Sequence, residues 1–116
     1  MIDAAQEWRE AAAFLAASAA YGQSDPVEVI DTSISRVFLS GVHAYKIKKP
    51  IKLGFLDFSS PGLRETDCRR EVALNRRTAP AIYLGVVAIT READGTLALD
   101  GTGMAVEWAV KMRRFD

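Results

Sequence analysis

The chain has little of the chemistry that metal and redox proteins use. Its 116 residues include one cysteine, Cys68, and one histidine, His43. A single cysteine can form neither a disulfide within the chain nor a cysteine-based metal site. A zinc site would need several carboxylates beside the one histidine. The sequence therefore predicts that this chain holds no metal.

An excess of charge of one sign is also absent, because 15 lysines and arginines balance 15 aspartates and glutamates. A chain with no net charge has no overall field that attracts nucleic acid or an anionic lipid surface. No apolar run approaches the roughly 18 residues that cross a membrane. The acidic residues near the N-terminus are not typical of a secretory signal. We expect a cytoplasmic protein that binds neither nucleic acid nor a membrane.

The residues that are present suffice for one small folded domain, since 49% are hydrophobic and 26% are charged. Alanine is the strongest helix former, and the alanine-rich residues 3–21 predict a helix. Its apolar stripe recurs every three or four positions, at Trp8, Ala11, Leu15 and Ala19. We assign residues 1–25 to this helix and a linker, and residues 26–116 to the main domain.

The main domain begins with three predicted strands, at residues 27–30, 36–40 and 43–48, which are β-branched, aromatic or alternating in polarity. The last two form a predicted hairpin. The segment that follows, IKLGFLDFSS, is expected to be hinge-like. Ser59 or Ser60 before Pro61 then predicts the start of a helix over residues 62–78.

Three more strands complete the order, predicted at residues 81–90, 96–100 and 104–115 and joined by tight turns. Strands grouped before and after a helix favour antiparallel pairing. We therefore expect an α+β fold in which an antiparallel sheet packs on the second helix.

One pair of charged residues carries most of the functional information. Lys46 lies on the third predicted strand, and Glu71 lies in the middle of the helix that follows. Enzymes of the protein-kinase type use a strand lysine to hold nucleotide phosphates and a helix glutamate to orient that lysine. A surface or structural salt bridge has the same pattern, so the pair alone leaves both interpretations open. The surrounding basic patch of Lys46, Lys48, Lys49 and Lys52 is interpreted as a solvated strand face.

Longer segments add a resemblance. The pieces YKIKKP, LDFS, LNRRTAPAIYLGV and WAVKMRRF together resemble the aminoglycoside phosphotransferase-like kinases, and they resemble most the amino-terminal part of bacterial proteins in which such a domain precedes a P-loop ATP-binding domain. The resemblance covers residues 27–115. It implies the small lobe of a protein-kinase-like fold, with a five-stranded antiparallel sheet and one packed helix that cover ATP.

The resemblance also implies roles for particular residues. Lys46 would hold the phosphates of ATP and Glu71 would be its helix partner. The loop that covers the phosphates would contain Thr32, Ser33 and Ser35, although it lacks the glycines of protein kinases. The strand that enters the adenine-binding hinge would end with Met112, as an apolar gatekeeper, and Arg113.

The same resemblance places the catalytic aspartate and the Mg²⁺-binding aspartate in a large lobe after the hinge, and the chain stops at Asp116. We therefore expect no catalytic residue here, ATP and Mg²⁺ as cofactors, and Mg²⁺ ligands outside the chain. The chain would be the ATP-binding half of a small-molecule phosphotransferase, inactive by itself, and either a fragment or a stand-alone remnant. The alternative is a non-catalytic α+β binding or assembly module, whose apolar floor meets a large lobe, a partner chain or a second copy.

Overall fold

The computed structural model of the chain describes residues 3–114. Its first helix, α1 (Ala4–Leu15), has Asp3 as its N-cap, and the Asp3 carboxylate accepts a hydrogen bond from the Gln6 N–H at 2.7 Å. The predicted helix over 3–21 is divided, because a short 3₁₀ helix, η1 (Ser18–Tyr21), follows α1 as a separate element. Gly22 ends η1 in the left-handed conformation, with φ of 67°.

Six antiparallel strands form the main sheet, in the order β1-β2-β3-β8-β6-β7. Their bounds are β1 (Glu28–Asp31), β2 (Ser35–Ser40), β3 (His43–Lys48), β6 (Tyr83–Arg91), β7 (Leu97–Leu99) and β8 (Met104–Arg113). The α+β class and the predicted β2–β3 hairpin are thus confirmed. The five-stranded sheet that the resemblance implied is wrong, because β7, which corresponds to the strand predicted at residues 96–100, pairs with β6 and makes a sixth.

The second helix, α2 (Pro61–Asn75), has Ser60 as its N-cap, and the Ser60 hydroxyl accepts a hydrogen bond from the Leu63 N–H at 3.3 Å. It ends three residues before the predicted boundary, and Arg76 Nε instead donates to the Tyr83 carbonyl at 3.1 Å. The segment expected to be hinge-like forms a small separate hairpin of β4 (Lys52–Leu53) and β5 (Leu56–Asp57). Gly54 turns this hairpin with φ of 56°.

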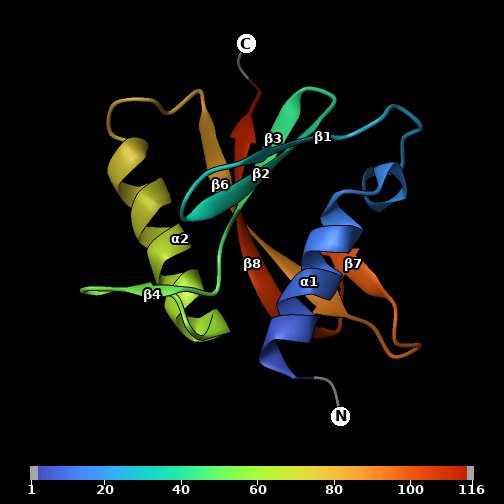
Figure 1. The fold of residues 1–116 in the computed structure, drawn as a ribbon. Coiled ribbons are helices and arrows are strands. Elements are labelled where there is room, and N and C mark those ends of the chain that lie inside the picture. The colour runs from blue at the N-terminus through green and yellow to red at the C-terminus, as the bar shows by residue number, and fades with distance from the viewer. Residues whose placement is uncertain (1–2, 115–116) are drawn as a thin grey trace.

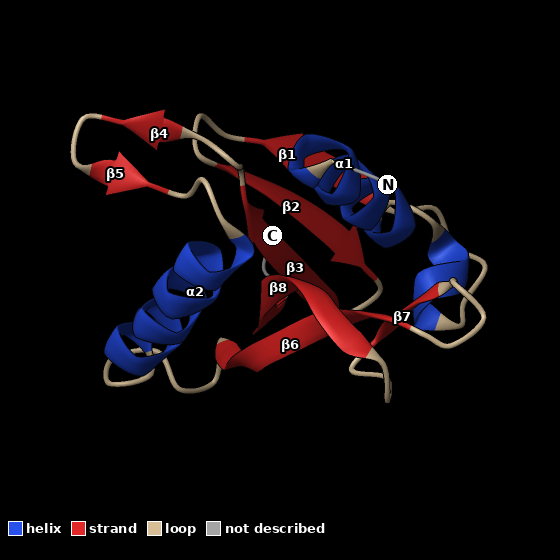
Figure 2. Ribbon diagram, turned by 90° about the horizontal axis from the view of Figure 1, so that it is seen from below, coloured by secondary structure: helices blue, strands red, loops and turns tan. Residues whose placement is uncertain are grey.

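The two helices lie against opposite faces of the sheet, as Figure 2 shows. Successive side chains of a strand point to opposite sides, and β3 divides accordingly. Tyr45 and Ile47 pack in a core with α1, whereas Ala44 packs in a second core with α2. The sheet therefore packs against two helices, where the resemblance implied one. No helix within residues 3–114 is long and apolar enough to cross a membrane.

The β4–β5 hairpin forms a separate small sheet and lies beside the N-terminal half of α2 (Figure 1). The side chain of Phe55 at its tip is fully exposed, and Leu53 is also exposed. The two edge strands of the main sheet are β1 and the short strand β7, and β7 packs near η1. The central strands β3 and β8 carry three of the residues that the sequence analysis singled out, namely Lys46, Met112 and Arg113.

Candidate functional site

The structure brings Lys46 and Glu71 into direct contact. The Nζ atom of Lys46 lies 2.7 Å from Oε2 of Glu71. Lys46 lies in the middle of the sheet, since β3 pairs it with Val37 of β2 and with Val110 of β8. Glu71 lies on the face of α2 that is turned to this sheet, and its side chain is 15% exposed. The contact predicted from the sequence is therefore present, between a central strand and the neighbouring helix.

A second lysine shares the same glutamate. Lys48 donates to Oε1 of Glu71, and its Nζ atom lies 3.1 Å from Oδ2 of Asp67, one helical turn before Glu71. We call Lys46, Lys48, Asp67 and Glu71 the lysine–carboxylate cluster. The side chain of Lys48 is 5% exposed, so the interpretation of the basic patch as a solvated strand face is wrong at this position. The spacing shows that Lys46 and Lys48 share one face of their strand and that Asp67 and Glu71 share one face of their helix, but it does not show that the two faces meet.

Opposite charges shift the pKa values of Glu71 and Lys48 in the directions that favour their ionised forms. Burial by itself would raise the pKa of Glu71, but the hydrogen bonds from Lys46 and Lys48 outweigh burial and hold this pKa below its usual value. Burial would likewise lower the pKa of Lys48, and the carboxylates of Glu71 and Asp67 raise it above its usual value. The cluster is thus a balanced set of two cations and two anions.

Helix α2 is fixed to the sheet by a second, fully buried ion pair. Arg64 Nη2 lies 2.9 Å from Oε1 of Glu107 on β8, and Arg64 Nη1 donates to the Phe58 carbonyl at 2.6 Å. Both side chains are 2% exposed or less. Cys68, one turn further along α2, is also buried, and burial raises the pKa of its thiol to about 12. Such a thiol stays protonated at neutral pH and is no nucleophile.

An apolar cavity of about 200 Å³ borders Lys46 on the same face of the sheet. None of its lining residues comes from α2. They come from five strands and are Ile30, Val37, Leu39, Ala44, Lys46, Tyr83 and Met112. Met112, the predicted gatekeeper, therefore lies in the cavity wall. Arg113 does not line it, and Arg113 Nε donates to the Ala81 carbonyl at 3.1 Å instead. Phe115, the last residue of the matched motif, lies outside the described residues.

The loop between β1 and β2 is a closed turn. The Thr32 N–H donates to the Ser35 carbonyl at 2.9 Å, and the Thr32 hydroxyl accepts from the Ser35 N–H at 2.9 Å. Ser33 at its tip is exposed, whereas Ser35 is buried. Because Ser35 pairs with Lys48, this turn lies at the Lys48 end of β3. The predicted phosphate loop thus lies beside the lysine–carboxylate cluster, with its terminal residues already bonded to each other.

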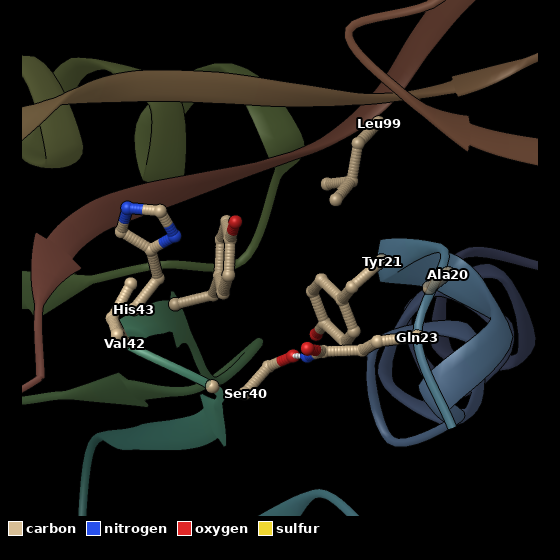
Figure 3. A pocket seen from close by; sticks show the side chains of 9 residues that line it. Ala20, Tyr21, Gln23, Ser40, Val42, His43 and Leu99 are labelled. Atoms are coloured by element: carbon tan, nitrogen blue, oxygen red, sulfur yellow. Dashed lines mark hydrogen bonds between the residues drawn. The ribbon is translucent and has the colours of Figure 1, made fainter. Parts of the chain in front are cut away.

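A different cavity, of about 310 Å³, lies on the α1 face of the sheet between η1 and the β2–β3 hairpin (Figure 3). Tyr21 of η1 stacks on Tyr45 of β3 with ring centroids 5.0 Å apart. Gln23 donates to the hydroxyl of Ser40, and the Tyr21 hydroxyl donates to the Leu15 carbonyl. The bonds of Tyr21 and Gln23 fit a role of this region in holding η1 and the following loop to the sheet.

No three histidine, cysteine, aspartate or glutamate side chains within residues 3–114 are grouped so that they could hold a metal ion. The two carboxylates nearest Lys46, those of Asp67 and Glu71, are already bonded to lysine ammonium groups. Carboxylates neutralised in this way do not fit a Mg²⁺ site, which needs free oxygen ligands.

Comparison with known proteins gives relatives without a stated activity. The chain is 36% identical over 89 residues to uncharacterized proteins of Mycobacterium bovis and of two strains of Mycobacterium tuberculosis. The match covers 77% of this chain but 16% of each relative, so the chain corresponds to a small part of their length. No family model matches the chain. No solved structure matches it either.

Proposed function

We propose that the chain is the small, ATP-binding lobe of an aminoglycoside phosphotransferase-like kinase, working in the cytoplasm. The observation that supports this proposal most is the contact of Lys46 with Glu71 beside an apolar cavity. A flat purine ring is apolar on both faces and suits a slot lined by aliphatic side chains and methionine. A phosphate chain suits an ammonium group at the border of that slot.

In this proposal each residue of the site has a physical task. Ala44 and Met112 form part of the wall against which adenine packs. Lys46 donates charge-assisted hydrogen bonds to phosphate oxygens, and Glu71 fixes the position of the Lys46 ammonium group. The turn of Thr32, Ser33 and Ser35 lies near enough to Lys48 to border the phosphates. Arg113 continues β8 toward the segment that would connect to a large lobe.

The described residues supply binding and orientation, and we assign the chemistry of phosphoryl transfer to another part of a larger protein. A catalytic aspartate that accepts the proton of the acceptor hydroxyl, and the ligands of Mg²⁺, would come from a large lobe. The relatives have room for such a lobe, because the match covers 16% of their length. The phosphate acceptor in this proposal is a hydroxyl group of a small molecule.

Binding measurements with ATP and with adenosine test the proposal. Lys46→Met keeps the apolar stem of the side chain and removes its charge. We expect ATP affinity to fall about 10-fold to 100-fold, the loss of one charge-assisted hydrogen bond, while adenosine affinity is unchanged. Lys52→Met is the matched control, because Lys52 is exposed on β4. Equal ATP affinity in the Lys46→Met variant and the unaltered chain, or no ATP binding by the unaltered chain, would contradict the proposal.

The second candidate function is a non-catalytic assembly module, and the exposed β4–β5 hairpin favours it. Phe55 at the hairpin tip is fully exposed, and Leu53 beside it is 58% exposed. Exposed apolar residues that project from a domain are typical of contact surfaces. If a second copy covers this hairpin, light scattering will show a mass that rises with protein concentration and a Phe55→Ser variant that stays monomeric. A monomer at every concentration excludes self-association through this hairpin.

A further inference from the structure

The lysine–carboxylate cluster contains one more cation than the proposed ATP contact uses. Each oxygen of the Glu71 carboxylate has its own lysine, Oε2 bonding to Lys46 and Oε1 to Lys48. Lys48 is the more buried of the two, since its side chain is 5% exposed and that of Lys46 is 24% exposed. The two lysines thus differ in what they can reach, because the Lys46 ammonium group borders the open cavity and the Lys48 ammonium group does not line it.

We propose that Lys48 is a positioning residue, which holds Glu71 and the middle of α2 against the sheet while Lys46 turns to the phosphates of a bound nucleotide. This inference rests on the proposed function. A lysine that shares its hydrogen bonds with phosphate weakens its bond to Glu71. A buried carboxylate that loses its only cation is strongly destabilised. With Lys48 bonded to Oε1, Glu71 keeps a cation throughout.

Asp67 makes the need for this second lysine greater. It lies one helical turn from Glu71, where like charges repel each other, and its Oδ2 is 3.1 Å from the Lys48 Nζ atom. Without Lys48, the Lys46 ammonium group would be the one cation of the cluster left to face both carboxylates. They would draw Lys46 toward the helix and add negative potential where the phosphates bind.

The backbone of Lys48 is fixed from the other side of the sheet. Its carbonyl oxygen accepts a hydrogen bond from the indole N–H of Trp8, on α1, at 2.9 Å. Its strand position is paired with Ser35 of β2. The side chain crosses to α2 and the carbonyl is held by α1, so Lys48 is placed by elements on both faces. A residue fixed in this way is suited to orient a neighbour rather than to move with a ligand.

The experiment compares Lys48→Met, Lys48→Arg and Lys52→Met by calorimetric titration with ATP and with adenosine. We expect Lys48→Met to weaken ATP binding about tenfold, at the low end of the loss expected for Lys46→Met because Lys48 acts through Glu71, with adenosine binding unchanged. Lys48→Arg keeps the charge and should restore most of the ATP affinity, and Lys52→Met should bind as the unaltered chain does. In carboxylate NMR titrations of the ligand-free protein, the pKa of Glu71 should rise in Lys48→Met and stay low in Lys48→Arg.

Two further variants separate positioning from a general effect on folding. Asp67→Asn alone leaves Lys48 on Glu71 and removes one negative charge, so ATP affinity should rise severalfold. Added to Lys48→Met, it removes the second carboxylate that competes for Lys46 and should recover part of the lost affinity. If Lys48→Met does not fold, the Asp67→Asn measurement decides, and lower ATP affinity in that variant overturns the inference.

Failure of this inference and failure of the proposed function give different results. If the unaltered chain binds ATP and Lys48→Met binds it equally well, the role of Lys48 is overturned and the proposed function stands. If the unaltered chain does not bind ATP, the proposed function is overturned, and with it the role of Lys48 toward a nucleotide. In that case the NMR titration still decides whether Lys48 holds Glu71, because an unchanged Glu71 pKa in Lys48→Met contradicts it.

Discussion

The two long helices pack on the same sheet by different means. The buried side chains of α1 are apolar and are those of Trp8, Ala11, Ala12 and Leu15. The buried side chains of α2 are those of Arg64, Cys68 and Val72. Helix α1 is thus held by the removal of apolar surface from water, whereas α2 combines the apolar packing of Cys68 and Val72 with ion pairs that connect it to β3 and β8. Strand β3 takes part in both arrangements, because alternate residues face opposite helices.

The difference shows which face of the sheet is available for chemistry. Buried charges stabilise a fold only when each one has a partner, so they are costly to keep. Within residues 3–114, no buried side-chain nitrogen or oxygen lacks a hydrogen-bond partner. The buried charges on α2 therefore have partners, and Glu71 also holds the Lys46 ammonium group at the border of an apolar cavity. The α1 face has no such cluster among the described ion pairs and adds stability to the sheet.

The largest expected effect breaks the attachment of α2. Glu107→Gln leaves the guanidinium group of Arg64 buried without its carboxylate, which should lower the free energy of unfolding by about 3–5 kcal/mol. Chemical denaturation measures this change. Glu65→Gln is the control, because the bond of Glu65 to Arg69 is exposed at the surface and such pairs contribute about 0–1 kcal/mol. Equal losses in the two variants would show that the buried pair does not anchor α2.

A somewhat smaller loss of unfolding free energy is expected when a buried side chain of α1 is shortened. Leu15 is fully buried, and Leu15→Ala should cost about 2–5 kcal/mol of unfolding free energy through lost burial and the cavity left behind. Leu74→Ala on the exposed side of α2 is the control and should change stability little. The Lys46–Glu71 contact lies on the other face, so Leu15→Ala should leave ATP affinity unchanged in the folded fraction. A matching loss of ATP affinity would mean that the two faces are not independent.

The smallest effect concerns pH. The pKa of Glu71 is lower in the folded chain than its usual value, so its ionised form stabilises the fold above the unfolded pKa, and this contribution is lost as pH falls through the folded pKa. We expect the stability difference between the unaltered chain and Glu71→Gln to narrow as pH is lowered from 7 toward 3. Its size at pH 7 should be about 1.5–3 kcal/mol, the range for a hydrogen bond to a charged group. A difference that stays constant over this range would exclude the lowered pKa as its cause.

Local sequence patterns predicted most of the fold. The strands expected at residues 36–40 and 43–48 agree closely with β2 and β3, because alternation and β-branching act within a few residues. The hairpin of β4 and β5 was missed, since strands of two residues are too short to show a period. The strand predicted at residues 96–100 corresponds to β7, so the residue patterns gave six strands, and the count of five came from the resemblance alone.

Part of the candidate site could also be predicted, because some of its residues are placed by local strand and helix patterns. The contact of Lys46 with Glu71 followed from strand and helix positions together with the resemblance. The burial of Lys48 did not, because a cluster of lysines in a sequence does not show which carboxylates a later helix will bring to it. The packing of α2 on β3 determines which carboxylates contact Lys48, and this packing depends on the whole chain rather than on the residues near Lys48.

The chain contains two tryptophans, and the fold puts one on each side of the sheet. Trp8 packs in the core with α1 and has the Arg36 guanidinium group 5.3 Å from its ring centroid, whereas Trp108 packs in the core with α2, with the Arg69 guanidinium group 5.2 Å away. Each half of the molecule therefore carries its own intrinsic fluorophore. Replacing either tryptophan by phenylalanine leaves a chain whose emission reports one side alone, so the order in which the two helices leave the sheet can be followed without any added label.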